Sequence, residues 1–200
     1  PAAEQLTTEG SVFSPEQARA IIEQFRATNE KLGKLRYLIV VTHEQMSSSP
    51  PTVADRNRTR DVEQWTRELF ASAGANLIDP SVGVPLLGSK PYHRLPAADN
   101  AKAKKDRAAL SGAADAVVEV TIVVRYVKVP TSAGETTYVV PGVMIEAYRI
   151  SDSALLGATS TLDVLKSRGL PDDAIMKITM HDRAETAALA LMEDMKRNVP

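Results

Sequence analysis

The 200-residue chain contains no cysteine, which excludes disulfide bonds, thiolate metal sites and cysteine nucleophiles. Aromatic residues make up only 4% of the sequence, so a hydrophobic core would consist mainly of Val, Ile, Leu and Ala. The formal net charge is -1, and this balance argues against a nucleic-acid-binding or anionic-membrane-binding surface. No apolar run approaches the roughly 18 residues of a transmembrane helix, so we expect no transmembrane segment.

The N-terminus has the composition of a loose segment. Residues 1–13 are polar and contain glycine, which predicts a flexible terminus. The chain starts with proline, and Pro1-Ala2-Ala3 resembles the small-residue flank that processing leaves behind, so we expect a mature form whose leader has been removed. Hydrophobic residues make up 44% of the sequence, enough for a core, and no repeat or change of composition divides the rest. Residues 14–200 are therefore predicted to form a single domain.

Residues 116–129 carry the strongest strand signal in the chain. They are rich in β-branched residues, which pack well on a pleated surface. Val118 and Tyr126 fall on one face of this strand, and Glu119 and Arg125 fall on the other. This period of two predicts one covered face, which includes Tyr126, and one face that meets water.

A three-stranded antiparallel meander is predicted around this segment. A turn at 130–134 leads into a second strand that ends at Ile150, and another turn at 151–153 leads into a third strand at 155–162. Residues 163–178 are predicted to be irregular, because Gly169-Leu170-Pro171 interrupts any regular element.

The first half of the chain alternates helices with apolar strands. Ser14 and Gln17 form a potential capping box for a helix that stops near Gly33. The apolar run 36–42 predicts an interior strand. The remaining predicted elements are helices at about 59–73 and 100–111, a short strand at 76–79, and a last helix from Thr179. This order predicts an α/β (α+β) fold with a single mixed sheet of about five strands and helices packed on its faces.

Several short motifs carry a resemblance to a known family. They are Ala73-Gly74 with Leu77-Ile78-Asp79, Gly112-Ala113-Ala114-Asp115-Ala116-Val117-Val118, and the hairpin from Ala147 to Gly157. Over about residues 36–198 the chain resembles the domain shared by bacterial envelope assembly lipoproteins. These include the curli-secretion lipoprotein, the penicillin-binding-protein activator lipoproteins and the N-terminal domain of TolB. The chain departs from them in its Ser153-Ala154 turn, its insertion at 80–99 and its additional N-terminal helix.

The resemblance implies a non-enzymatic, periplasmic or outer-membrane-associated domain that acts in assembly. We expect an envelope protein as partner, self-association into a homo-oligomer as a further possibility, and no cofactor or nucleic acid. The segment 45–58 is rich in Ser and Pro, and the segment 80–99 is long. Binding function often lies on such loops of a rigid scaffold.

An alternative site lies at the end of the first strand. His43 and Glu44 follow its carboxyl end, which is where open α/β sheets bind ligands. We favour a polar pair that faces water. The alternative is a small-molecule-binding or hydrolytic site that uses both side chains, with help from Asp79 or the 80–99 loop.

Other chemical motifs are incomplete. The segment Gly83 to Lys90 nearly matches a phosphate-binding loop, but Ser and Lys are transposed and Pro91 follows, so a surface loop is expected. The three histidines lie in different segments without metal-ligand spacing, and no catalytic set is evident. Four cationic or polar residues remain as candidate ligand or partner contacts beside His43 and Glu44, namely Arg56, Arg58, Lys90 and His93.

Overall fold

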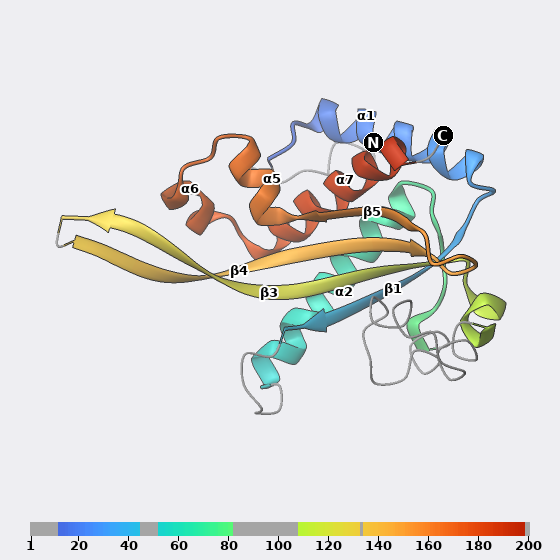
Figure 1. Cartoon of the computed structure of the whole chain (residues 1–200), viewed down its shortest axis with the longest axis horizontal. Helices are drawn as coiled ribbons and strands as arrows, with labels where there is room; N and C mark the ends of the chain where they lie inside the picture. The colour runs from blue at the N-terminus through green and yellow to red at the C-terminus, as the bar shows by residue number, and fades with distance from the viewer. Residues whose placement is uncertain (1–11, 45–51, 82–107, 133, 199–200) are drawn as a thin grey trace.

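The computed structural model describes residues 12–44, 52–81, 108–132 and 134–198. Within these ranges a five-stranded sheet has the strand order β2-β1-β3-β4-β5 (Figure 1). The strands are β1 (Arg36–His43), β2 (Asn76–Leu77), β3 (Ala116–Thr131), β4 (Gly134–Arg149) and β5 (Leu155–Ser160). The helices with both ends described are α1 (Pro15–Lys31), α2 (Val53–Ser72), α5 (Thr161–Ser167), α6 (Asp172–Lys177) and α7 (Met180–Asn198).

The sheet is mixed, as predicted. Strand β1 is parallel to both of its neighbours, β2 and β3. Strands β3, β4 and β5 form the antiparallel meander. Helices α1, α2 and α7 cover one face of the sheet, and a helical segment at 108–113 packs on the other through Leu110. The predicted α/β fold class, with one mixed sheet and helices on its faces, is confirmed.

The helix starts follow local capping chemistry. The predicted capping box of α1 is confirmed, since the Ser14 hydroxyl accepts from the Gln17 amide at 3.2 Å and the Gln17 side chain accepts from the Ser14 amide at 3.0 Å. Helix α2 begins six residues earlier than predicted, at Val53 instead of about Thr59. A second capping box, between Thr52 and Asp55, starts it directly after the Pro-rich run.

The prediction of an irregular segment at 163–178 is wrong, because it contains most of α5 and all of α6. Gly169, with φ +74°, lies in the turn between these two helices, and Pro171 is the residue that precedes the first turn of α6. Strand β5 ends at Ser160 and not at 162, because the Ser160 hydroxyl accepts from the Asp163 amide at 3.2 Å and so caps α5. The predicted strand at 76–79 is reduced to the two residues of β2.

The loose N-terminal segment predicted for residues 1–13 does not extend through Phe13. The Phe13 ring is buried, and the Arg168 guanidinium lies 4.0 Å from its centroid. Residues 1–11 lie outside the described residues, as do residues 100–107 of the predicted third helix. In the described part of the chain no helix combines the length and the apolar character needed to cross a membrane.

Three aromatic rings form the centre of the core. Phe25 of α1 meets Phe70 of α2 edge to face at 5.6 Å, and Tyr37 of β1 lies 6.1 Å from Phe25. The Tyr37 hydroxyl donates to the Asn29 side chain at 3.0 Å, so its polar atom is satisfied inside the core. Burial raises the pKa of Tyr37, which keeps the phenol neutral and able to donate.

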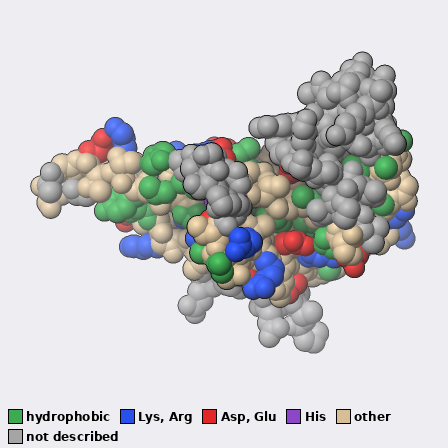
Figure 2. Space-filling view, turned by 90° about the horizontal axis from the view of Figure 1, so that it is seen from below, with side chains coloured by type: hydrophobic (Ala, Val, Ile, Leu, Met, Phe, Trp, Pro, Cys, Tyr) green, Lys and Arg blue, Asp and Glu red, His purple; other side chains and the backbone are tan. Residues whose placement is uncertain are grey.

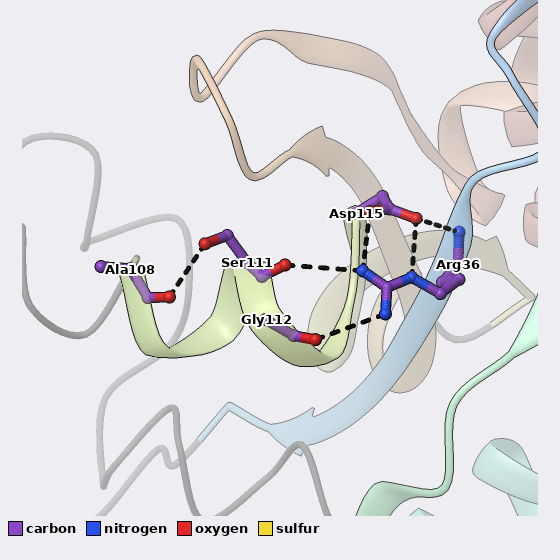
Figure 3. Close-up of polar contacts among 5 residues, drawn as sticks. All are labelled: Arg36, Ala108, Ser111, Gly112 and Asp115. Carbon is purple, nitrogen blue, oxygen red and sulfur yellow. Dashed lines mark hydrogen bonds and ion pairs between the residues drawn. The ribbon is translucent and has the colours of Figure 1, made fainter.

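An ion pair ties the starts of β1 and β3 together (Figure 3). Nε and Nη2 of Arg36 donate to the two carboxylate oxygens of Asp115 at 3.0 Å each, and the Arg36 backbone amide donates at 2.9 Å. The guanidinium also donates to the carbonyl oxygens of Ser111 and Gly112, at the end of the helical segment 108–113. This bidentate pair therefore aligns two parallel strands and the helix that enters the second one.

Replacing Asp115 with asparagine is expected to lower the free energy of unfolding at pH 7 by about 1–2 kcal/mol, since the pair is partly exposed. Hydrogen bonds from Arg36 hold the pKa of Asp115 below its ordinary value. The stabilisation is therefore complete above the unfolded pKa of about 4 and is lost as pH falls through the lower folded pKa. Urea unfolding from pH 7 to pH 2 should show the wild-type and Asp115→Asn curves converging. A difference that is independent of pH would contradict this.

Candidate functional site

Strands β3 and β4 extend well beyond the rest of the sheet. Strand β1 pairs with β3 only as far as Ile122, and β5 pairs with β4 only as far as Met144. Residues 123–131 and 134–142 continue as a two-stranded ribbon, which projects away from the helical layer in Figure 1. We call this ribbon the arm.

The arm exposes large hydrophobic side chains. Tyr126 and Val139 are direct cross-strand partners on one face of the arm, and they are 62% and 63% exposed. Tyr138 is exposed on the opposite face. Figure 2 shows hydrophobic side chains gathered along the projecting end of the molecule. Three of the five large exposed hydrophobic residues among the described residues lie in the arm, so this surface differs from the rest of the fold.

The predicted division of β3 into a covered and a water-facing side is wrong at two positions. Tyr126 belongs to the face predicted as covered, yet it is exposed, beyond the last residue of β3 that pairs with β1. Glu119 belongs to the face predicted to meet water, but it is only 2% exposed. Val118 is buried, as its face predicts.

The structure places the side chains of His43 and Glu44 on opposite faces of the sheet. His43 lies over α2, with Nε2 3.8 Å from the Asp55 carboxylate. The Glu44 carboxylate instead accepts from Arg125 of β3 at 3.1 Å. Asp79 caps a turn by accepting from the Ser81 amide at 2.8 Å, and no hydrogen bond or ion pair among the described residues joins it to either side chain. The three groups therefore do not converge on one site.

Asp55 has a structural role that accounts for its contact with His43. The hydroxyl and amide of Thr52 lower the pKa of Asp55, with smaller contributions from His43 and from Arg58, whose Nη1 lies 3.7 Å away. The carboxylate is thus ionised near neutral pH and stabilises the N-terminus of α2. Arg56 lies exposed in the first turns of the same helix. The other two candidate contacts, Lys90 and His93, lie outside the described residues.

The separation of His43 from Glu44 makes a thermodynamic prediction. The variants His43→Ala and Glu44→Ala should change the free energy of unfolding independently. The His43 ring contacts Asp55 of α2 and the Glu44 backbone carbonyl, which Glu44→Ala retains, whereas the Glu44 carboxylate pairs with Arg125 of β3. Urea unfolding of both single variants and the double variant should give a coupling energy within about 0.5 kcal/mol of zero. A coupling energy above about 1 kcal/mol would show that the two side chains share an interaction that the structure does not contain.

A groove of about 510 Å³ lies beside the base of the arm and is lined by residues of β3, β4, β5 and α5. Its rim carries charges of both signs, from Arg125, Glu146, Asp163 and Lys166. The only hydroxyls that line it belong to Thr159, Ser160 and Tyr126, and that of Ser160 donates to Asp163 at 2.5 Å as part of the cap of α5. No histidine lines the groove, and no cluster of three or more His, Asp or Glu in the described ranges could hold a metal ion. Within the described residues, the hydrogen bond from Ser160 to Asp163 is accounted for by the cap of α5.

Sequence reasoning missed the arm as a site. The available signal was the length of β3, because 16 alternating residues are more than its eight-residue neighbour β1 can cover. No model of a protein family and no curated protein matches this chain, so these comparisons do not assign a family or a function.

Proposed function

We propose that this chain is a non-enzymatic protein-interaction domain of the bacterial cell envelope and that the arm is its contact surface. The observation that carries this proposal is the exposed pair formed by Tyr126 and Val139 on a ribbon that lies beyond both flanking strands. An isolated two-stranded ribbon is only marginally stable in water, and a bound partner would supply the missing packing. The assignment to the cell envelope rests on the resemblance in sequence.

The alternative of a ligand-binding or hydrolytic site at the end of β1 has less support. It requires His43 and Glu44 to act on the same molecule, whereas they lie on opposite faces with Asp55 and Arg125 as partners. The groove beside the arm offers charge and volume, but its Ser160 hydroxyl and Asp163 carboxylate serve as the cap of α5. Binding of a protein through the arm requires neither a ligand shared by His43 and Glu44 nor a nucleophile in the groove.

Site-specific photo-crosslinking tests the proposal. The photoreactive residue benzoylphenylalanine is placed at position 126 of the arm or, as a control, at position 53, whose valine is 64% exposed on α2. Both variants are produced in bacterial cells with an export signal and irradiated. We expect a discrete protein adduct at position 126 and none at position 53, and mass spectrometry would tell an envelope protein from a second copy of this chain. Absence of an adduct at 126, or the same adducts at both positions, would overturn the proposal.

A further inference from the structure

We propose that the open edge of β3 in the arm binds an extended, acidic segment of a partner protein as an additional β-strand. This inference rests on the proposed function and specifies the mode of binding and the chemistry of the partner. The edge is formed by the backbone of Val124, Tyr126 and Lys128.

The direction of these backbone groups follows from the ladder. The Glu44 amide donates to the Ile122 carbonyl at 2.8 Å, so the polar groups of Ile122 point toward β1. Outward-pointing and inward-pointing residues alternate in an antiparallel pair, so Val124, Tyr126 and Lys128 point to the same side. No described strand pairs with β3 there, because the pairing with β1 ends at Ile122. Three consecutive outward amides therefore continue the line of β1.

The other edge of the arm is interrupted by proline. The residues of β4 opposite Val124, Tyr126 and Lys128 are Pro141, Val139 and Thr137. Pro141 has no amide hydrogen and lies just beyond the point where the pairing with β5 ends, so an added strand could not continue that line. On β3 the corresponding proline, Pro130, comes only after Lys128. Among the described residues, the β3 edge is thus the one without a strand partner or a proline between Val124 and Lys128. The Arg125 guanidinium donates to the Val124 carbonyl at 3.0 Å, and an added strand would replace this hydrogen bond.

Charge selects an acidic segment. Residues 123–131 of β3 include the cations Arg125 and Lys128 and no carboxylate. Both cations are well exposed and pair with the surface carboxylates Glu44 and Glu135. Such exposed pairs contribute little free energy, so the cations can exchange these partners for carboxylates on an incoming strand. A segment with two acidic residues three positions apart, and an apolar residue between them beside Tyr126, matches this edge.

Strand addition explains why the arm exposes apolar side chains next to an open edge. In this binding mode, main-chain hydrogen bonds provide affinity and alternating side chains provide specificity. A third strand would also convert a marginal ribbon into a three-stranded sheet. Contact between Tyr126 and an apolar residue of the added strand would bury part of its exposed ring.

The test uses the complete chain and a defined peptide. The probe is a fluorescein-labelled eight-residue peptide, Thr-Val-Glu-Thr-Val-Glu-Val-Thr, whose binding is measured by fluorescence anisotropy. Lys128→Pro and Thr137→Pro form a matched pair, since each removes one outward amide at directly opposed positions of the arm. Lys128→Ala controls for the lost charge. We expect at least tenfold weaker binding by Lys128→Pro than by Lys128→Ala, and binding within twofold of wild type by Thr137→Pro. Strand addition would be overturned if Lys128→Pro and Lys128→Ala bound the peptide equally well or if the two proline variants weakened binding equally. It would also be overturned if the wild-type protein showed no saturable binding of the peptide.

Two N-methylated versions of the peptide test the same geometry on the unaltered protein. One is methylated at the alternate residues whose amides would face β3, and the other at the remaining alternate residues, whose amides would face away. Methylation of the residues whose amides face β3 should weaken binding at least tenfold, and methylation in the other register should change it less than threefold. Equal effects in both registers would contradict strand addition even if a proline variant failed to fold. The crosslink at position 126 separates the two proposals. An adduct that forms although the peptides show no register dependence leaves the arm as a contact surface and removes only strand addition, whereas absence of the adduct removes both.

Discussion

Replacing Arg183 with alanine is expected to lower the free energy of unfolding by about 3 kcal/mol. The Arg183 side chain is only 1% exposed, and its guanidinium donates to the carbonyl oxygens of Ile175 at 2.5 Å and Ile178 at 3.1 Å. These hydrogen bonds satisfy the end of α6 from inside the protein. The part-buried Ile178 carbonyl would lose this donor at a cost of about 1–3 kcal/mol, and truncation also leaves a cavity. The Ile175 carbonyl keeps the longer hydrogen bond from the Ile178 amide at 3.4 Å. The loss is moderated because burial disfavours the charged guanidinium and lowers the pKa of Arg183, an effect that Asp182 opposes.

Urea unfolding at pH 7 measures this effect, and two variants serve as controls. Arg183→Met keeps most of the side-chain volume and should be less destabilising than Arg183→Ala, because no large cavity forms. Arg197→Ala removes an exposed arginine from the same helix, where it pairs with Glu193 at 3.6 Å, and should change stability by less than about 0.5 kcal/mol. A loss of less than about 1 kcal/mol in Arg183→Ala would show that Arg183 does not hold α6 in place.

Truncation of Phe25 to alanine is expected to cost about 3–5 kcal/mol. The Phe25 ring is fully buried and contacts the rings of Tyr37 and Phe70, so it joins α1 to β1 and α2. The surrounding rings belong to three different elements and cannot collapse together into the space that the truncation leaves. The chain has few aromatic residues, so no other ring in this cluster can replace the lost contacts.

Chemical denaturation should separate Phe25→Ala from Phe25→Leu, which leaves a smaller cavity and should cost less than half as much. Both variants should retain the slope of the unfolding transition, since they alter packing rather than the extent of the folded chain. If the two variants had equal stability, the aromatic cluster would not be the centre of the core.

The fold could be predicted where local chemistry and periodicity agree. The Ser14–Gln17 capping box and the apolar run of β1 predicted both elements within a residue or two. The start of α2 could not be predicted in the same way, because a run of Ser and Pro hides the Thr52–Asp55 capping box. Helices α5 and α6 were missed because each is short, and the Gly169–Pro171 break dominates the pattern around them.

The candidate site could not be predicted from periodicity alone. Val120 and Tyr126 share one face of β3, and the alternation between them is unbroken. Val120 lies in the core cluster with residues of α1, α2 and α7, whereas Tyr126 lies beyond the last residue that pairs with β1, so exposure depends on how far the neighbouring elements reach. Likewise, adjacency in sequence placed His43 beside Glu44, whereas the alternation of a strand directs neighbouring side chains to opposite faces.

The central claim is that the arm is a contact surface that can be separated from the folded body. The most direct measurement uses a chain in which residues 125–140 are replaced by an Asn-Gly turn, with the crosslinker placed in both the shortened and the full-length chain at position 124, which is half-buried on the same face of β3 as Tyr126. We predict that the body of the shortened chain unfolds within a few degrees of the full-length protein, because the core lies between the sheet and α1, α2 and α7. We also predict that the adduct formed by the full-length chain disappears. A folded, shortened chain that still forms the same adduct would contradict the claim.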